Sequence, residues 1–153
     1  MRELINLVEA LDPNSVKGLI QRFGGRKIEF RNLPQIVQQA ILTRAAEHLD
    51  PDWDKPPKIN PKKKFGYVEI PMEDLQQAVL ANIKRNDPDA PFETFDDYHK
   101  WYVSHGDTPN HTDIWPIELE VTNPEMGFID DGSHRFHSYV RRGVKVVPAI
   151  YAV

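Results

Sequence analysis

A run of prolines divides this chain into two parts. Four prolines fall within the fifteen positions of residues 50–64. Proline lacks a backbone N–H and fixes its φ angle, so no regular helix or strand forms at that density. We therefore expect an extended connector at the end of a helical N-terminal segment, residues 1–60. An α/β part, residues 65–153, follows it. The whole chain of 153 residues has the length of one ordinary domain.

The chain contains no cysteine, which excludes several classes of site. A disulfide framework, a thiolate zinc site, an iron–sulfur cluster and a cysteine nucleophile all require that residue. The apolar runs are short, and the N-terminus lacks a basic region followed by an apolar one. We therefore expect no signal peptide, no membrane span and a cytoplasmic location.

Charge is distributed unevenly along the sequence. Residues 1–64 carry 12 Lys and Arg against 8 Asp and Glu, whereas residues 85–131 carry 2 against 12. An acidic middle segment argues against a uniformly basic surface for nucleic acid. It leaves room for a local phosphate site in the basic parts.

Hydrophobic periodicity and turn residues predict the regular elements. In the N-terminal part we expect helices over residues 1–11, 16–23 and 33–49 and a short strand over residues 27–30. In the second part we expect strands over residues 67–70, 114–121, 126–129 and 144–153, and helices over residues 72–83, 95–102 and 132–142.

Two features of these elements predict burial. Pro148 removes one hydrogen-bond donor from the last strand, so we expect it at a sheet edge or a bulge. Phe95, Tyr98, Trp101 and Tyr102 share one helix face, and we expect this aromatic face to lie in the core.

The sequence of most functional interest joins a predicted strand to a predicted helix. Gly132 permits a close backbone approach, and the N–H groups of Ser133, His134 and Arg135 point out of the helix start. Arg135 adds a planar positive fork that matches phosphate. These residues together predict a phosphate site.

Two acidic residues precede that glycine. Asp130 or Asp131 beside a phosphate site can hold a divalent ion such as Mg²⁺, or take a proton from an attacking hydroxyl. The alternative is structural: Asp131 and Ser133 cap the helix, while Phe136 and Tyr139 pack its inner face. Capping accounts for the acid and the serine but not for the neighbouring histidine and arginine.

A family resemblance begins at the same turn. Residues 131–135 read Asp-Gly-Ser-His-Arg, and a helix ending in Arg142-Gly143 and a Val-Pro strand follow. This order resembles the signature of the ParB/sulfiredoxin superfamily over about residues 65–153, with an insertion at about residues 85–113. The resemblance implies an α+β fold, a small mixed sheet with helices, preceded here by the N-terminal helical segment.

The resemblance also implies a nucleotide ligand. Members include partition proteins that bind CTP, sulfiredoxins that use ATP, free-serine kinases and nucleases, so the family does not fix one function. Its phosphate contacts fall on His134 and Arg135 of this chain, and its backbone cradle falls on Gly132 and Ser133. Asp131 takes the place of the acid near the metal or acceptor.

Three further positions follow from the comparison with the family. Glu69, in the first strand of the second part, is the carboxylate that would approach the site. Ser133 stands where sulfiredoxins have their catalytic cysteine, so reduction of a sulfinic acid is excluded. The sequence stops at Val153, so we expect no helix-turn-helix module after the domain.

Four polar residues fall in and beside a predicted loop of the acidic segment. Their spacing matches no standard zinc site. We expect them to form part of a lid over the nucleotide or to contact the substrate. They are His105, Asp107, His111 and Asp113.

Two functional hypotheses follow. The first is a nucleotide-binding enzyme that uses ATP or another nucleotide with Mg²⁺, either a phosphotransferase, a nucleotidase or a nuclease acting at the Asp-Gly-Ser-His-Arg turn. The second is a non-catalytic module that engages a protein partner or DNA through residues 1–60, of the kind found on phages and plasmids. The sequence leaves the nucleotide, the acceptor and the oligomeric state open.

Overall fold

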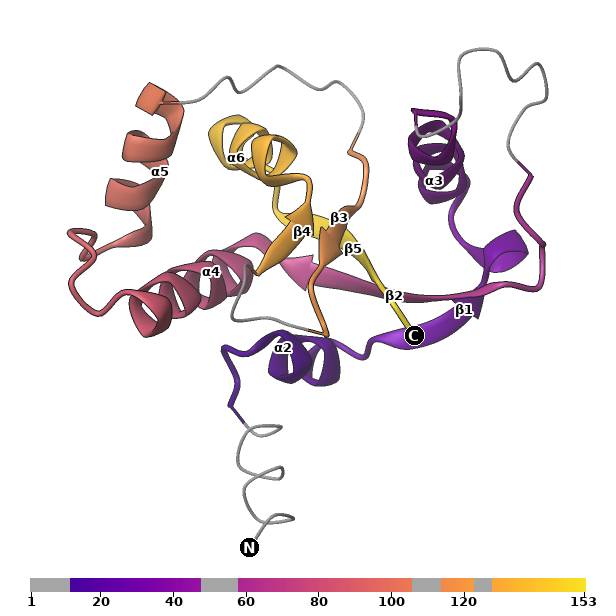
Figure 1. Ribbon diagram of the computed structural model, residues 1–153, viewed down its shortest axis with the longest axis horizontal. Coiled ribbons are helices and arrows are strands. Elements are labelled where there is room, and N and C mark those ends of the chain that lie inside the picture. Colours follow the sequence, from indigo (N-terminus) through magenta and orange to yellow (C-terminus); the bar gives the residue numbers. More distant parts are fainter. Residues whose placement is uncertain (1–11, 48–57, 106–113, 123–127) are drawn as a thin grey trace, which may run out of the picture.

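The structure is a computed structural model that describes residues 12–47, 58–105, 114–122 and 128–153, apart from the side chains of Asp130 and Asp131. Within these residues the chain forms an α+β fold, which confirms the expected class (Figure 1). The helices are α2 (Val16–Arg22), the 3-10 helix η1 (Phe30–Asn32), α3 (Gln35–Glu47), α4 (Met72–Asn86), α5 (Phe95–His105) and α6 (Ser133–Arg142). The strands are β1 (Arg26–Glu29), β2 (Lys64–Pro71), β3 (Ile117–Leu119), β4 (Ile129–Asp131) and β5 (Val146–Tyr151).

One mixed sheet joins both parts of the chain. Its strand order is β1-β2-β5-β3-β4, with β3 and β5 parallel and the other pairs antiparallel. Strand β1 precedes the proline run and pairs along β2, where Arg26 lies opposite Tyr67. The N-terminal segment therefore contributes an edge strand to the same sheet as the second part.

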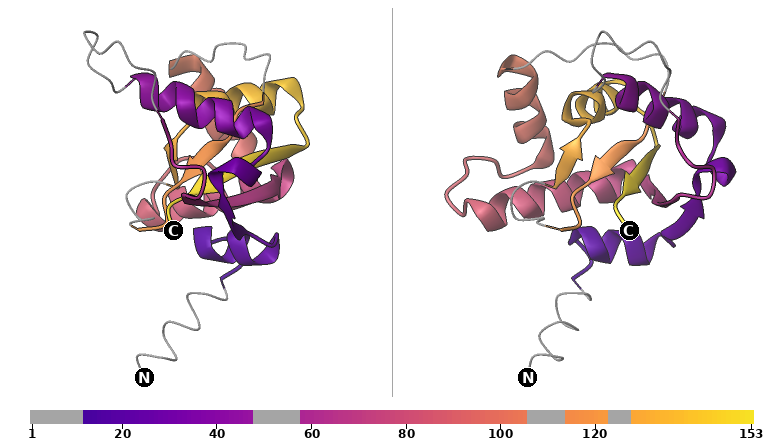
Figure 2. Two further views of the ribbon diagram at one scale, coloured as in Figure 1. Left: turned by 90° about the vertical axis from the view of Figure 1, so that its right-hand side faces the viewer. Right: turned by 45° about the vertical axis from the view of Figure 1, so that its right-hand side comes forward.

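Alternation along the strands gives the sheet two apolar faces. In β2, Val68 and Ile70 belong to the larger core, whereas Phe65 and Tyr67 pack on the opposite side. Helices α2, α4 and α6 supply the larger core, and α3 covers the opposite face with Val37. Figure 2 shows the strands between α3 and the pair formed by α2 and α4.

The expectation for Pro148 is wrong, because β5 lies in the interior of the sheet. Pro148 pairs with Glu69 of β2, while the register with β3 begins only at Ala149, opposite Ile117. Strand β3 is shorter than predicted, so Pro148 has a paired strand on one side alone. A short neighbour thus accommodates the proline inside the sheet.

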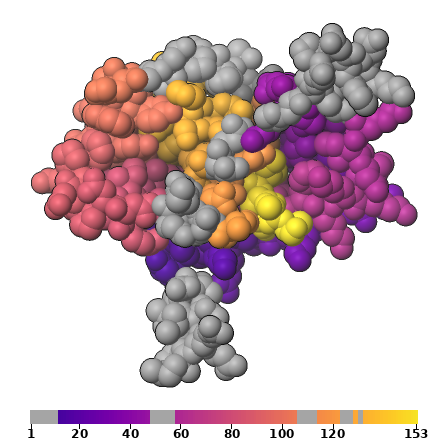
Figure 3. All heavy atoms as spheres, in the orientation of Figure 1, coloured from indigo at the N-terminus to yellow at the C-terminus, as the bar shows by residue number. Residues whose placement is uncertain are grey.

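Helix α5 forms one flank of the molecule (Figure 3). Its expected core face is only partly buried: Tyr98 is half-buried, and Trp101 is 46% exposed and stacks on His105 of the same helix. The expectation that Trp101 lies in the core is therefore wrong. A helical stripe shows which residues share a face, but it does not show how much of that face a neighbour covers.

None of the described helices has both the length and the apolar character needed to cross a membrane.

Candidate functional site

The turn between β4 and α6 is built on a glycine in the left-handed region. Gly132 has φ 103° and precedes the first residue of α6, and its carbonyl accepts the N–H of Phe136 at 2.8 Å. A Cβ at this position would lie 2.9 Å from Nη2 of Arg135 and 3.1 Å from Cγ2 of Ile117. Glycine is therefore required for the backbone angle and for the close packing of the turn on β3.

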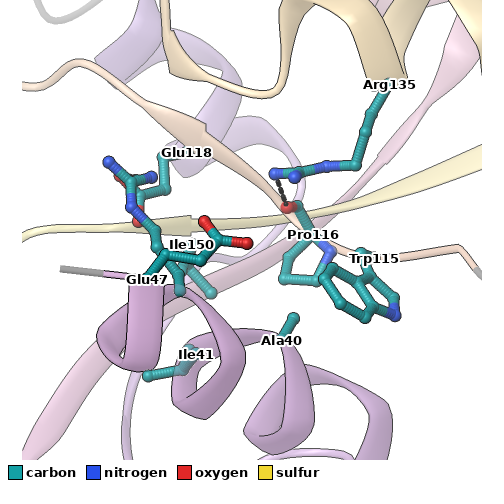
Figure 4. Close-up of a pocket in the computed structure, with 9 residues that line it drawn as sticks. Ala40, Ile41, Glu47, Trp115, Pro116, Glu118, Arg135 and Ile150 are labelled. Atoms are coloured by element: carbon teal, nitrogen blue, oxygen red, sulfur yellow. Dashed lines mark hydrogen bonds and ion pairs between the residues drawn. The ribbon is translucent and has the colours of Figure 1, made fainter. Parts of the chain in front are cut away.

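Arg135 extends from this turn across the start of β3. Its Nη2 donates a hydrogen bond to the carbonyl oxygen of Pro116 at 3.0 Å. The guanidinium is thereby fixed on the α3 side of the sheet, where it lines a pocket (Figure 4).

The pocket lies between α3 and the start of β3. Its volume is about 90 Å³, the scale of a phosphoryl group rather than of a whole nucleotide. Figure 4 shows the ring of Trp115 along one wall, and the carboxylate of Glu47 facing the same space as Arg135. Ala40 and Ile41 of α3 form the apolar floor.

A second arginine lines the same pocket. Nη1 of Arg44 lies 2.8 Å from Oε2 of Glu118, and their side chains are 35% and 26% exposed. Two guanidinium groups and the carboxylates of Glu47 and Glu118 therefore share one small space. The formal charges balance, so an anion would be selected by the arginine N–H donors rather than by a net positive field.

A larger hollow lies next to this pocket. It has a volume of about 240 Å³ and shares Glu118 and Ile150 with the first pocket. Phe65 and Tyr151 give it aromatic walls. The phosphoryl-sized pocket and this larger hollow thus share one lining residue from β3 and one from β5.

The structure does not bring all of the predicted residues to this pocket. His134 is exposed, and its Nδ1 lies 3.2 Å from the hydroxyl of Tyr102 on α5. Glu69 is exposed in β2 and accepts a hydrogen bond from the Tyr67 hydroxyl at 2.9 Å. Of the predicted catalytic side chains that the structure describes, Arg135 alone lines the pocket.

The other predicted site residues have separate positions. Ser133 lines a different cavity, between α4, α5 and α6. His105 ends α5, and its Nδ1 lies 2.8 Å from the carbonyl oxygen of Trp101. Asp107, His111 and Asp113 lie outside the described residues.

The predicted magnesium ligands are placed only by their backbone. Asp131 lies opposite Glu118 in the register of β3 and β4. The side chains of Asp130 and Asp131 are outside what the structure describes. Within the described part of the chain, no three His, Asp or Glu side chains form a group able to hold a metal ion.

Sequence reasoning missed the four other charged or aromatic residues of the pocket. Glu118 alternates with the buried residues of β3, and Trp115 precedes that strand. Their positions fit a strand pattern, but neither residue belongs to a motif that indicates a functional site. Arg44 and Glu47 stand three positions apart near the end of α3, which looks like an ordinary solvated helix end. Only the position of α3 over the sheet brings them to Arg135.

Comparison of the chain with models of known families, with curated proteins and with solved structures found no match.

Replacing Gly132 with Ala tests the packing of the turn. We expect a loss of about 2 kcal/mol in the free energy of unfolding, because a non-glycine residue is strained at this φ and its Cβ meets Ile117. Gly143→Ala is the matched control: it also has a positive φ, 73°, but no described atom lies within 4 Å of its Cβ. Urea denaturation of both variants separates the two contributions, and equal losses would contradict a role for the close approach.

Proposed function

We propose that this protein binds a nucleotide on the α3 face of the sheet and transfers or hydrolyses its phosphoryl group. The phosphates lie between Arg44 and Arg135, and the nucleoside extends into the adjoining hollow. One observation carries the proposal: guanidinium groups from α3 and from the Asp-Gly-Ser-His-Arg turn line one pocket of phosphoryl size. The resemblance of that turn to the ParB/sulfiredoxin signature supports the same ligand.

The arginines supply the electrostatic part of the chemistry. A guanidinium pairs with phosphate oxygens through parallel N–H donors, and it stays charged at every relevant pH. Charge that develops on the transferred group is stabilised by donors already fixed in place, as Arg135 is by Pro116. In this proposal Arg44 exchanges part of its contact with Glu118 for the ligand.

The carboxylate of Glu47 has a role in proton transfer. The attacking hydroxyl forms a bond to phosphorus, the bond from phosphorus to the leaving oxygen breaks, and the hydroxyl proton passes to Glu47. Mg²⁺ brought with the nucleotide neutralises phosphate charge when it is bound. The described residues provide no metal-binding group, so we assign no protein ligand to it.

A second candidate function is binding without turnover. The balance of two arginines by two carboxylates in the pocket favours it, because charges already paired bind an additional phosphate less strongly. In that case the nucleotide, a protein partner or DNA is held and released unchanged.

A thermal-shift experiment with ATP, ADP, CTP, GTP and adenosine, each with and without Mg²⁺, tests the binding step. At about 100 times its dissociation constant, a ligand adds about 2.7 kcal/mol, which raises the melting temperature by several degrees. We expect one nucleotide to produce this shift, adenosine to produce little, and Arg135→Ala to remove it. Each shift is measured against the ligand-free melting temperature of the same variant.

Two controls make the result specific to the pocket. Arg142→Ala removes an exposed arginine from the other end of α6 and should keep the full shift. Arg44→Gln should lose most of it, because that residue lines the pocket from α3. A shift that persists in both Arg135→Ala and Arg44→Gln would place the nucleotide elsewhere. Phosphate release is measured separately, and release by the wild type but not by these variants would separate turnover from binding.

A further inference from the structure

A second cavity lies on the other side of the sheet, between α4, α5 and α6. Its volume is about 340 Å³, within the range of small-molecule sites in proteins. Phe128 and Phe136 form apolar walls, and polar groups of Asn82, Asn86, Ser133 and His137 also line it. None of these six residues lines the pocket of Arg135.

Asn82 interrupts the apolar face of α4. The buried residues of this helix are Met72, Leu75, Ala78, Val79 and Asn82, which share one stripe. Asn82 is 6% exposed, and it accepts a long hydrogen bond of 3.4 Å from Nδ2 of Asn86. Asn82 therefore brings a hydrogen-bonding amide to the cavity end of an otherwise apolar stripe.

His137 brings a second buried polar group to the cavity. It is 1% exposed, and its ring stacks on Tyr102 with the centroids 3.8 Å apart. Its Nδ1 lies 2.8 Å from Nδ1 of His99, an arrangement in which one ring must donate and the other accept. At least one of the two imidazoles is therefore neutral.

The charges of the lining residues indicate which ligand charge the cavity favours. Asp87, at the exposed end of α4, is the one formally charged residue among the described residues that line the cavity, and it is negative. An anion would find no positively charged side chain among the described lining residues, in contrast to the pocket of Arg44 and Arg135. The amides of Asn82, which is buried, and of Asn86, which is exposed, instead match a ligand that presents both a donor and an acceptor.

We propose that this cavity is a second binding site, which takes a small uncharged ligand with an aromatic ring and an amide-like edge. The ring packs between Phe128 and Phe136, and the polar edge pairs with Asn82 and Asn86. The proposal is independent of nucleotide binding, since the two sites share no described lining residue.

A matched pair of ring compounds tests the proposal on the full chain. Benzamide and benzoate have the same shape and differ in charge. A ligand of this size binds with a dissociation constant of about 1 mM, so titration followed by NMR is appropriate. We expect benzamide to shift the side-chain amide signals of Asn82 and Asn86 in a saturable way, and benzoate to bind at least about tenfold more weakly.

Two variants on α4 localise the binding. Asn82→Leu keeps the volume and removes the amide, so benzamide binding should weaken by about tenfold. Gln77→Leu makes the same kind of change on the exposed face of the helix and should leave binding unchanged. If Asn82→Leu fails to fold, Asn86→Ala replaces it, because Asn86 is exposed. Equal binding of benzoate, or no saturable shift with benzamide at about ten times that dissociation constant, would overturn the proposal.

Discussion

Replacement of Tyr139 with Phe is expected to lower the free energy of unfolding by about 3 kcal/mol. Tyr139 is completely buried in α6, and its hydroxyl makes two hydrogen bonds to one backbone position. It donates to the carbonyl oxygen of Trp115 at 2.9 Å and accepts from the N–H of Trp115 at 2.8 Å. Phenylalanine fills the same space but leaves both backbone groups without this partner, and an unsatisfied group costs about 1–3 kcal/mol.

The matched control for this change is Tyr67→Phe. That hydroxyl donates one exposed hydrogen bond to Glu69, so its loss should cost less than about 1 kcal/mol. Urea denaturation of both variants gives the comparison. Similar losses in the two variants would contradict a structural role for the Tyr139 hydroxyl.

The same variant also connects the core to the proposed site. Trp115 and Pro116 line the pocket, and Pro116 holds the guanidinium of Arg135. Loosening of the chain at Trp115 should therefore reduce the nucleotide-dependent thermal shift of Tyr139→Phe, measured against its own ligand-free melting temperature. A destabilised variant with the full shift would indicate that this segment does not position the site.

Local sequence patterns were sufficient to predict α6 and the turn before it. Gly132 and Gly143 lie on either side of this helix, both with positive φ, and Phe136 and Tyr139 supply its buried face. Each of these features depends on neighbours within a few positions, so periodicity and turn chemistry express it directly. Strand β4 extends to Asp131, past the predicted end at residue 129, because the edges of short strands show little pattern.

Which residues form the site depends on how distant helices and strands pack together, and local sequence patterns do not contain this information. Arg44 reaches the pocket because α3 lies over the sheet face that carries Glu118 and Ile150. His134 follows Ser133 in sequence, yet helical rotation directs it to Tyr102 and away from the Arg135 pocket. A motif of consecutive residues at a helix start therefore spreads over several sides of the helix.

Acidification should destabilise the fold through His137. Burial lowers the pKa of this imidazole to about 3 from its ordinary value of 6.5, and the neighbouring His99 and His134 act in the same direction. Between these two values the unfolded chain binds a proton that the folded chain does not, so the free energy of unfolding falls as the pH drops below about 6.5. The expected slope is about 1.4 kcal/mol per pH unit, or about 2 kcal/mol lost by pH 5.

The groups around His99 and His137 influence which of the two imidazoles takes up a proton. Desolvation also lowers the pKa of His99, Asp96 acts to raise it, and Arg141 acts to lower it. Since the two imidazoles share the 2.8 Å contact, protonation of both would place two positive charges together and separate α5 from α6. The stacking of His137 on Tyr102 would be lost with that separation.

Urea denaturation of the wild type and two variants between pH 5 and pH 7.5 tests this assignment. His137→Phe keeps an aromatic ring against Tyr102 but removes the proton acceptor, so its stability should depend less steeply on pH by about 1.4 kcal/mol per unit. His105→Phe removes an exposed histidine that stacks on Trp101, and it should keep the wild-type slope. Equal slopes in all three proteins would show that proton uptake on unfolding does not occur at His137.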